Sequence, residues 1–495
     1  MRESGILLPV SALPSRYGIG CFDAAAYAFV DQLARAGQRV WQILPLGPTG
    51  YGDSPYQSFS TFAGNPYFIS LDELVRRGWL TREECDAADF GGDARYVDYG
   101  ALYQQRLPLL RLAYVRSEIA DDPAFRAFVE RQRWWLEDYA LYMAIKDANG
   151  GRSWQEWEDG LKLRRAEALA PARAALAEEI GFYQFLQFCF FTQWHALLDY
   201  AHGRGVRILG DIPIYVALDS ADAWAAPELF QLDDGRRPRA VSGCPPDAFA
   251  ADGQVWGNPL YRWDYHRETG YAWWIRRIAF CFEIYDILRI DHFRGFDEYF
   301  SIPAGDQTAH NGHWEKGPGL ELFRAIEGRI GQREIVAEDL GYVTDTVRQL
   351  VTDTGFPGMK VFEFAFDSRD TGSAADNLPH NYLRNSVACT GTHDNATLLG
   401  WLGEITPEEY AQVQDYLATG AEGAQLCHQM VCAVLRSVSR LAVIPMQDHL
   451  ALGNEARINQ PSSQGTNWRW RLLPDEFSRE LEGRIRKLTQ IYGRL

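Results

Sequence analysis

The chain has 495 residues, 46% of them hydrophobic, which is enough apolar material for a large core. Its net charge of −17 argues against nucleic acid and an anionic membrane surface as partners, because both need a basic patch. The balance fits a protein with a neutral substrate. Aromatic residues make up 13% of the chain. Most aromatic side chains fill cores, but a surplus also suits the stacking of flat sugar faces on rings.

Eight cysteines occur without a Cys-X-X-Cys pair, and several lie in apolar runs such as Phe188-Cys189-Phe190. This usage favours free, buried thiols in a reducing compartment. The first residues run into a strand-like segment and lack the long apolar core of a signal peptide. Four polar residues interrupt the most apolar stretch, 181–198, which indicates a buried helix and no membrane span. We expect a cytoplasmic protein.

Short runs rich in β-branched and apolar residues predict eight strands. In chain order they are 6–9, 39–44, 206–216, 284–290, 334–337, 360–364, 386–392 and 441–446. Helical patterns separate most of them. One helix is expected over 24–36, with Asp23 as N-cap and Gly37 as its end, and another over 344–354, ended by Gly355. Strands that alternate with helices in this number predict an α/β fold, the (β/α)8 TIM barrel.

The predicted strands are unevenly spaced. Residues 45–205 separate the second strand from the third and carry long helical patterns at 123–149 and 165–178. Because this is too long for a loop, we expect a mostly helical insertion over about 46–205 within one catalytic barrel of residues 1–495. A second insertion, about 219–263, is rich in Pro, Gly and Asp, and we expect irregular structure with an active-site loop there. Too few residues follow the eighth strand for a separate C-terminal β-domain.

Three acidic residues each follow a predicted strand. Asp291 stands in Arg-Ile-Asp-His-Phe, Glu338 in Val-Ala-Glu-Asp-Leu-Gly, and Asp394 in Thr-His-Asp-Asn. Carboxylates at the carboxyl ends of parallel barrel strands face the barrel mouth, where active sites lie. Asp211 in Gly-Asp-Ile-Pro is a fourth acid of this kind. Two carboxylates that flank one bond make a glycosidase-type site, so the set points to glycosidic-bond chemistry.

Asp291 has a catalytic and a structural interpretation. Alternate residues of a strand point to the same side, so Arg289 shares a face with Asp291. A guanidinium beside a carboxylate keeps it ionised, which a nucleophile requires. The alternative is an ion pair that only stabilises the strand end.

The other two acids are equally open to two interpretations. Partial burial would raise the pKa of Glu338, which would suit a general acid. Alternatively, Glu338 caps the next helix, although Asp339 is the better candidate for that cap. His393 and Asp394 together can hydrogen-bond sugar hydroxyls. Alternatively, His393 is a core histidine with satisfied hydrogen bonds.

Other chemistries lack their motifs. The sequence has no Walker A motif, no G-x-G-x-x-G after a strand, no H-E-x-x-H, no EF-hand pattern and no G-x-S-x-G elbow. His310 and His313 lie in a Gly-rich loop without an accompanying ligand set. We therefore expect neither a metal nor an organic cofactor.

The motifs resemble those of glycoside hydrolase family 77, the 4-α-glucanotransferases of the α-amylase clan. The resemblance covers nearly the whole chain and rests on residues 47–58, 210–216, 255–261, 289–294, 337–341, 391–395 and 459–461. The three acids alone would indicate only the clan, whereas the flanking motifs are specific to the family. Many α-amylases have Asn-His at the end of the third-strand motif. Here Ile-Tyr-Val stands there, which disfavours a calcium-bound amylase.

The resemblance implies roles for individual residues. Asp291 would be the nucleophile, Glu338 the general acid/base and Asp394 the transition-state stabiliser. The substrate-binding residues would be Arg289, His393 and Asp211 at the donor sugar, with His292, Tyr51, Tyr56, Phe249 and Trp256. Phe249 would lie on a mobile loop at 245–249. The family works without a metal or an organic cofactor.

The function implied is retaining transfer of an α-1,4-glucan segment from a donor maltodextrin to the 4-hydroxyl of an acceptor glucan, through a covalent glycosyl-enzyme. Maltooligosaccharides and α-1,4-glucans would be the partners. Two alternatives stay open, because the catalytic residues cannot separate transfer from hydrolysis. One is a plain α-glucan hydrolase, and the other is a noncatalytic glucan-binding protein, which need not keep all three acids.

Overall fold

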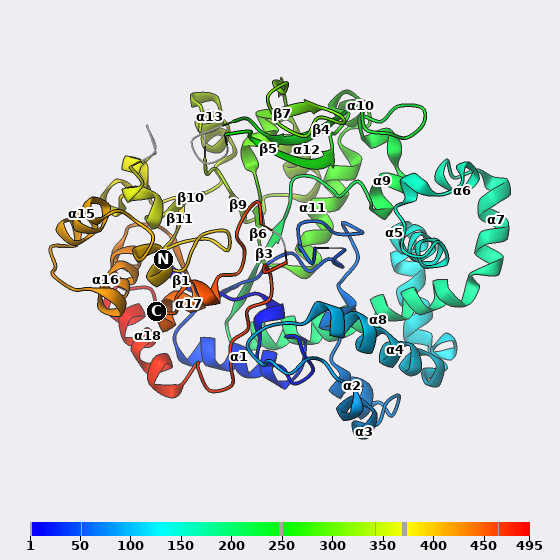
Figure 1. Ribbon diagram of the computed structural model, residues 1–495, viewed down its shortest axis with the longest axis horizontal. Coiled ribbons are helices and arrows are strands. Elements are labelled where there is room, and N and C mark those ends of the chain that lie inside the picture. The colour runs from blue at the N-terminus through cyan, green and yellow to red at the C-terminus, as the bar shows by residue number, and fades with distance from the viewer. Residues whose placement is uncertain (1, 51, 247–250, 342, 369–373, 464) are drawn as a thin grey trace.

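The computed structural model describes residues 2–50, 52–246, 251–341, 343–368, 374–463 and 465–495. Eight parallel strands close into a barrel in the spatial order β1-β12-β11-β10-β9-β6-β3-β2 (Figure 1). They are β1 Glu3–Leu7, β2 Val40–Gln42, β3 Arg207–Ile212, β6 Ile287–Ile290, β9 Ile335–Ala337, β10 Gly358–Val361, β11 Ser386–Cys389 and β12 Leu441–Pro445. Each overlaps one predicted run, and the predicted (β/α)8 barrel is confirmed.

Local sequence signals set the ends of the barrel helices. Helix α1, Ala24–Arg35, begins where the Asp23 side chain accepts a hydrogen bond from a free backbone N–H. Its buried positions follow the helical period: Ala26, Phe29, Val30 and Leu33. Helix α13, Asp345–Thr354, begins at the N-cap Thr344. It ends at Gly355, whose φ of 70° is the left-handed conformation that glycine adopts at no steric cost.

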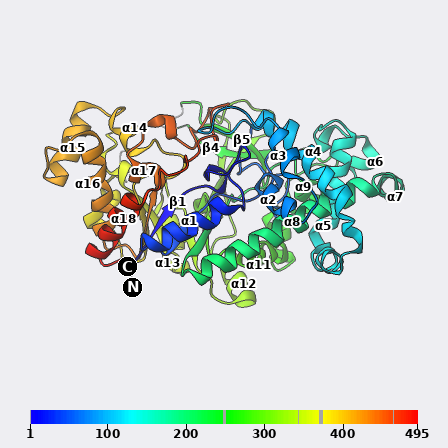
Figure 2. The same cartoon turned by 90° about the horizontal axis from the view of Figure 1, so that it is seen from below.

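Helices occupy most of the chain between β2 and β3, on the right of Figure 1, and the view from below places α5 to α7 on the same side (Figure 2). They are α2 Leu71–Arg76, α3 Arg82–Ala87, α4 Tyr99–Ser117, α5 Pro123–Ala148, α6 Asp159–Lys162, α7 Ala166–Ala175 and α8 Ala177–Gly203. Helix α8 packs on α5 and also on α1 and β3, so it returns the chain to the barrel. Among the described residues, no helix is long and apolar enough to cross a membrane.

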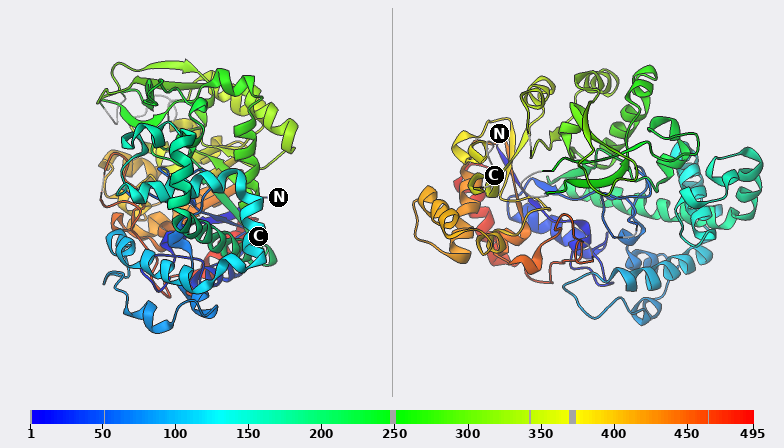
Figure 3. Two further views of the ribbon diagram at one scale, coloured as in Figure 1. Left: turned by 90° about the vertical axis from the view of Figure 1, so that its right-hand side faces the viewer. Right: turned by 45° about the horizontal axis from the view of Figure 1, so that its top comes forward.

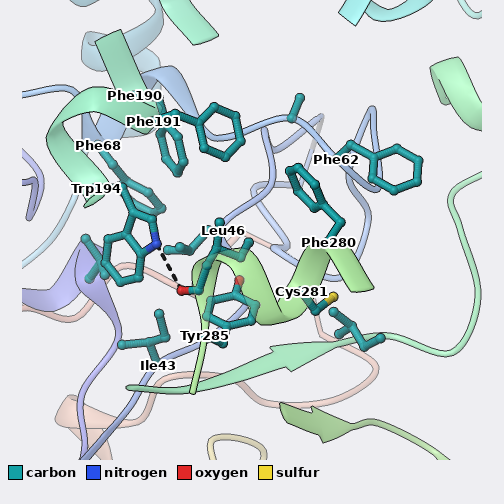
Figure 4. Close-up of a cluster of buried hydrophobic side chains, with 14 of the residues drawn as sticks. Ile43, Leu46, Phe62, Phe68, Phe190, Phe191, Trp194, Phe280, Cys281 and Tyr285 are labelled. Carbon is teal, nitrogen blue, oxygen red and sulfur yellow. Dashed lines mark hydrogen bonds between the residues drawn. The ribbon is translucent and has the colours of Figure 1, made fainter. Parts of the chain in front are cut away.

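An aromatic cluster joins α8 to the barrel helix α11, Ala272–Ile284 (Figure 4). Phe191 of α8 meets Phe280 of α11 edge to face at a centroid distance of 5.9 Å. Trp194 donates its indole N–H to the carbonyl oxygen of Ile284 at 3.0 Å. Each such buried side chain contributes about 1.5–3 kcal/mol by leaving water. The cluster therefore fixes the helical segment against the barrel.

A second sheet of four antiparallel strands lies beside the barrel, at the top of Figure 1, and the right panel of Figure 3 brings it forward. Its order is β5-β4-β7-β8, with β4 Ala240–Cys244, β5 Gln254–Pro259, β7 Glu298–Pro303 and β8 His313–Lys316. The prediction of irregular structure over 219–263 is wrong at β4 and β5. Strand β4 pairs with β5 on one side and with β7 on the other. Because β7 follows the barrel strand β6, its pairing with β4 joins distant segments, and no local pattern could reveal it.

The chain after β12 contains two α-helices, and the described residues between them are mostly turns and loops. It holds α17, Met446–Leu450, and α18, Arg479–Ile491, and α18 packs on α1 and α16. Past β12, the described residues add no strand. The described chain ends lie side by side (Figure 1), where the Arg494 guanidinium donates to the carbonyl oxygen of Glu3 at 2.8 Å.

The remaining helices are α9 Ala221–Ala225, α10 Trp263–Glu268, α12 Leu320–Ile330, α14 Leu398–Leu402, α15 Pro407–Leu417 and α16 Gly423–Arg436.

Candidate active site

The register of three neighbouring strands brings the predicted site residues to one rim of the barrel. Asp211 on β3 pairs directly with Arg289 on β6. Just beyond the strands, the Asp291 N–H donates to the Ile212 carbonyl at 2.9 Å, and the Glu338 N–H donates to the Ile290 carbonyl at 3.1 Å. These backbone hydrogen bonds join the ends of β3, β6 and β9. They therefore fix the backbone positions of Asp291 and Glu338 relative to each other.

Arg289 is a buried cation between two carboxylates. Its Nη1 lies 2.6 Å from an Asp211 oxygen, and its Nη2 lies 3.0 Å from Asp291 Oδ1. The Arg289 side chain is 4% exposed and that of Asp291 is 28% exposed. The predicted shared face of Arg289 and Asp291 is confirmed. Asp291 presents its carboxylate to the barrel mouth, while Arg289 supports it from behind.

Asp211 holds other side chains in place. It is fully buried, and it accepts a hydrogen bond from the Tyr56 hydroxyl at 2.8 Å besides the one from Arg289. Its second oxygen has no hydrogen-bond partner among the described residues. Burial raises the pKa of Asp211, and the Arg289 guanidinium opposes that rise. The Asp211 side chain has no exposed surface in this structure, and its contact with the donor sugar stays a prediction.

Glu338 is held in an environment that favours its protonated form. Its two oxygens accept hydrogen bonds from the backbone N–H groups of His292 at 2.7 Å and Leu340 at 3.0 Å. Burial and the neighbouring Asp291 charge nevertheless raise the pKa of Glu338 to about 8, against Arg289 and those two donors. The direction is the one expected for a general acid.

Asp339 does not cap the next helix, contrary to the prediction. It accepts a hydrogen bond from the Met359 backbone N–H at 2.7 Å, on the neighbouring strand β10. Thr344 caps α13 instead. Asp339 thus supplies the hydrogen-bond acceptor for the Met359 backbone N–H of β10.

His393 and Asp394 form a pair at the end of β11. His393 Nε2 lies 3.2 Å from Asp394 Oδ1, and the Asp394 side chain is 43% exposed. Burial lowers the pKa of His393, so the ring is neutral at neutral pH. The Tyr56 ring stacks on His393 with centroids 5.0 Å apart and planes 11° apart. Tyr56 thereby links the Asp211 and Asp394 sides of the site.

Three further residues of the site were not predicted as functional. Asn459 donates to Asp394 Oδ1 at 2.6 Å, and Arg457 donates to the Asp394 carbonyl at 2.7 Å. The Trp468 ring lies 5.9 Å from Tyr56 and 6.0 Å from His393. All three come from the segment after β12. Asn459 belongs to a motif noted in the sequence, but nothing local marks Trp468 or Arg457.

Trp256 on β5 and His292 after β6 meet at the mouth of the barrel. Their rings are edge to face at a centroid distance of 4.9 Å. Trp256 donates its indole N–H to the Gln254 side chain at 3.0 Å. Burial and the nearby Arg294 lower the pKa of His292 to about 3, so its ring is neutral. The predicted contacts Tyr51 and Phe249 lie outside the described residues.

The titratable groups of the site fall into two kinds, which is the arrangement of an acid and a nucleophile. The raised pKa of Glu338, about 8, favours its protonated form at neutral pH, and Asp291 is paired with a buried guanidinium. Within the described ranges, no group of three or more His, Cys, Asp or Glu residues is arranged to hold a metal ion. His310 and His313 instead contact Asp252 at 3.1 Å and Glu315 at 3.3 Å.

Known proteins of one family match this chain from end to end. The family model of the 4-alpha-glucanotransferases, glycoside hydrolase family 77, matches residues 8–475. A 4-alpha-glucanotransferase of Clostridium butyricum is 47% identical over 98% of this chain and 99% of its own length. One from Thermus thermophilus is 48% identical over 100% and 99%.

Two solved structures extend the comparison. The amylomaltase of Streptococcus agalactiae in complex with acarbose superposes with a TM-score of 0.96 at 41% identity, over 100% of both chains. The Corynebacterium glutamicum amylomaltase, at 19% identity and a TM-score of 0.78 over 99% of this chain and 75% of its own, shares the fold. The chain belongs to the 4-alpha-glucanotransferase family, glycoside hydrolase family 77.

Proposed function

We propose that this protein transfers an α-1,4-glucan segment from a donor maltodextrin to the 4-hydroxyl of an acceptor glucan or glucose, with retention of configuration. The site takes maltooligosaccharides and α-1,4-glucans. Family membership supports the reaction. The observation that carries the mechanism is the Glu338 carboxyl, whose pKa is raised to about 8, beside an Asp291 that is paired with Arg289.

In the first half of the reaction, an Asp291 oxygen attacks the anomeric carbon of the donor. The glycosidic C–O bond breaks, and the Glu338 proton moves to the departing 4-oxygen. The donor segment is then bound covalently to Asp291 as an ester. Glu338 is left as a carboxylate, and the first product leaves with its new 4-hydroxyl group.

In the second half, Glu338 takes the proton from the 4-hydroxyl of an acceptor, whose oxygen attacks the same anomeric carbon. The ester bond to Asp291 breaks, and a new α-1,4 bond forms with the original configuration. Glu338 is protonated again, and Asp291 is again a carboxylate. The charges and protons therefore balance over one cycle without any co-reactant.

Asp394 stabilises the positive charge that develops on the donor sugar between the two states. Its carboxylate is held by Asn459 and His393, and it is the most exposed of the three acids that the mechanism uses. His393, neutral and stacked on Tyr56, also binds sugar hydroxyls. Arg289 and Asp211 position their neighbours. Arg289 holds Asp291 in place, and Asp211, itself paired with Arg289, holds Tyr56.

Trp256 and His292 form the acceptor side of the site. Water competes with the acceptor for the covalent intermediate, and both meet the same Asp291 ester and the same base. Only a surface that orients the acceptor and excludes water can favour transfer. In this proposal Trp256 helps to exclude water on this side; of the predicted mobile loop 245–249, residues 247–249 lie outside the described residues.

Trapping the covalent intermediate tests the mechanism. Glu338→Gln cannot protonate a sugar leaving group, but an α-glucosyl fluoride donor needs little acid assistance. We expect this variant to accumulate a hexosyl group on the peptide that contains Asp291, seen by mass spectrometry after digestion. The Asp291→Asn, Glu338→Gln double variant is the control and stays unlabelled. A label on another residue would overturn the assignment.

A further inference from the structure

A buried carboxyl group that the mechanism does not use lies behind the Asp394 loop. Glu363 stands just after β10 and is 2% exposed. Its backbone N–H donates to the Thr390 carbonyl at 3.1 Å, at the end of β11. Its Oε1 has no hydrogen-bond partner among the described residues. A buried polar atom left without a partner costs about 1–3 kcal/mol, so the position calls for an explanation.

The carboxyl group of Glu363 closes over the backbone of the loop that carries Asp394. A Cβ atom placed on Gly391 would lie 3.1 Å from Glu363 Oε1 and 3.0 Å from Asn395 Cβ. Such contacts are tighter than ordinary van der Waals contact. A larger residue at position 391 would require Glu363 or Asn395 to shift by a few tenths of an ångström.

Asn395 connects Glu363 to the loop. Its Oδ1 accepts two hydrogen bonds from Thr392, from the backbone N–H at 2.9 Å and from the hydroxyl at 2.8 Å. With Oδ1 occupied by Thr392, the amide nitrogen of Asn395 is the group available to Glu363, and Asn395 Cβ and Glu363 Oε1 both approach Gly391. The Thr392 hydroxyl oxygen in turn accepts the backbone N–H of Asp394 at 3.2 Å. Hydrogen bonds thus link Asn395 through Thr392 to Asp394, and Glu363 lies beside Asn395 at Gly391.

The surroundings of Glu363 favour its protonated form. Burial raises its pKa well above the usual range, the nearby Asp448 adds to the rise, and Arg457 and Asn395 oppose it. Asp448 is also buried, and it accepts hydrogen bonds from Thr390 at 2.5 Å and from the Leu398 N–H at 2.9 Å. Asp448 thus supports β11 and α14, whereas Glu363 faces the turn 392–395.

We propose that Glu363 is a positioning residue for the transfer reaction. Acting through Asn395, it fixes the turn 392–395 and thereby the place of Asp394 at the barrel mouth. This inference rests on the proposed role of Asp394. Wild-type protein that makes no transfer products would defeat that function, whereas the variants below test only the positioning.

The test compares Glu363→Leu, Asn395→Ala and their combination in maltotriose disproportionation. Each single change should lower kcat about tenfold or more and change KM less than about threefold, because the lost interaction acts on the transition state. The kcat of the double variant should lie no more than about threefold below that of the poorer single variant, because both changes remove the same interaction between Glu363 and Asn395. Independent effects would multiply to about a hundredfold, and that result would overturn the proposal.

Two matched variants separate positioning from stability. Glu363→Gln keeps the shape of the side chain and a carbonyl oxygen that can accept a hydrogen bond from Asn395, so its kcat should stay within about threefold of wild type. Asp448→Asn changes a buried acid beside the same strand and should lower Tm without a specific loss of kcat. A Glu363→Gln variant as inactive as Glu363→Leu would contradict the proposal. If Glu363→Leu fails to fold, Asn395→Ala decides, and an unchanged kcat there overturns the proposal.

Discussion

At the scale of single residues, the site depends on carboxyl groups that have the same chemistry but different surroundings. Glu338 is half-buried beside Asp291, and desolvation together with the Asp291 charge raises its pKa to about 8. Asp291 is paired with Arg289, and Asp394 is exposed and held by Asn459. Because burial and partners differ, one residue type can supply an acid, a nucleophile and a stabilising charge.

Replacing Asp291 by Asn should abolish turnover and leave the fold intact. The change removes the nucleophile but keeps the shape of the side chain, so kcat on maltotriose should fall by at least about a thousandfold. Tm should change by no more than about 3 °C, because Asp291 is partly exposed. Turnover within tenfold of wild type, in protein shown by mass to be free of reverted Asp, would refute the assignment.

The pH dependence of the reaction should report Glu338. The residue must be protonated to act as an acid, so kcat/KM should fall as the pH rises through about 8. Glu338→Gln should lack this limb with a fluoride donor. A wild-type profile that stays level through this range would mean that another group supplies the proton.

The same pKa shift predicts how stability varies with pH. In the folded protein Glu338 keeps its proton up to about 8, and the ordinary value is 4.5. Between these values the folded state binds the extra proton, so stability falls as the pH rises. The Tm of Glu338→Gln should therefore rise relative to wild type between about pH 5 and about pH 9. A Tm difference that stays constant over this range would contradict the shift.

Residue-level prediction from the sequence succeeded where a local rule applied. The period of two along a strand was enough to place Arg289 beside Asp291. The burial of Asp211 could not be predicted, since it depends on Tyr56 from a distant loop. Trp468 was missed for the same reason, because only the fold brings it to Tyr56 and His393.

At the scale of elements, the barrel strands were visible in the sequence and the antiparallel strands were not. Each barrel strand is a short apolar run, buried on both faces, and such runs stand out from the helices between them. Strand β4 pairs with β7, which is far away in the sequence, and β5 lies at the sheet edge beside β4. Their local sequence therefore resembles a loop.

The element that should control transfer is β5, through Trp256. Trp256→Ala should lower the yield of longer maltodextrins more than it lowers donor cleavage, because it removes stacking area and admits water. Product chromatography against total donor consumed measures the ratio. Trp79→Ala, which removes a half-buried Trp packed on Phe185, is the matched control and should leave the ratio unchanged. An equal loss of transfer and cleavage in Trp256→Ala would contradict the role.

At the scale of the whole molecule, one barrel carries the chemistry, and the helices between β2 and β3 are fixed to it by buried aromatic rings. The length of that insertion was readable from the strand spacing. Its packing was not, because Phe191 and Phe280 are brought together only by the fold.

Chelation should not affect the activity of the whole protein. In the parts of the chain that the structure describes, no cluster of three metal-ligating side chains occurs. The reaction proposed here uses only carboxyl groups and their neighbours. We expect equal rates before and after treatment with EDTA and gel filtration. A loss of activity that one divalent cation restores would require a metal in the mechanism.

The most direct test of the account is the fate of maltotriose with the wild-type protein. Transfer conserves the number of glycosidic bonds, so the reaction should give glucose and a ladder of longer maltodextrins while total reducing ends stay nearly constant. Hydrolysis consumes one bond for each new reducing end. If reducing ends rise in step with donor consumption, water is the acceptor and the assignment of transfer is contradicted.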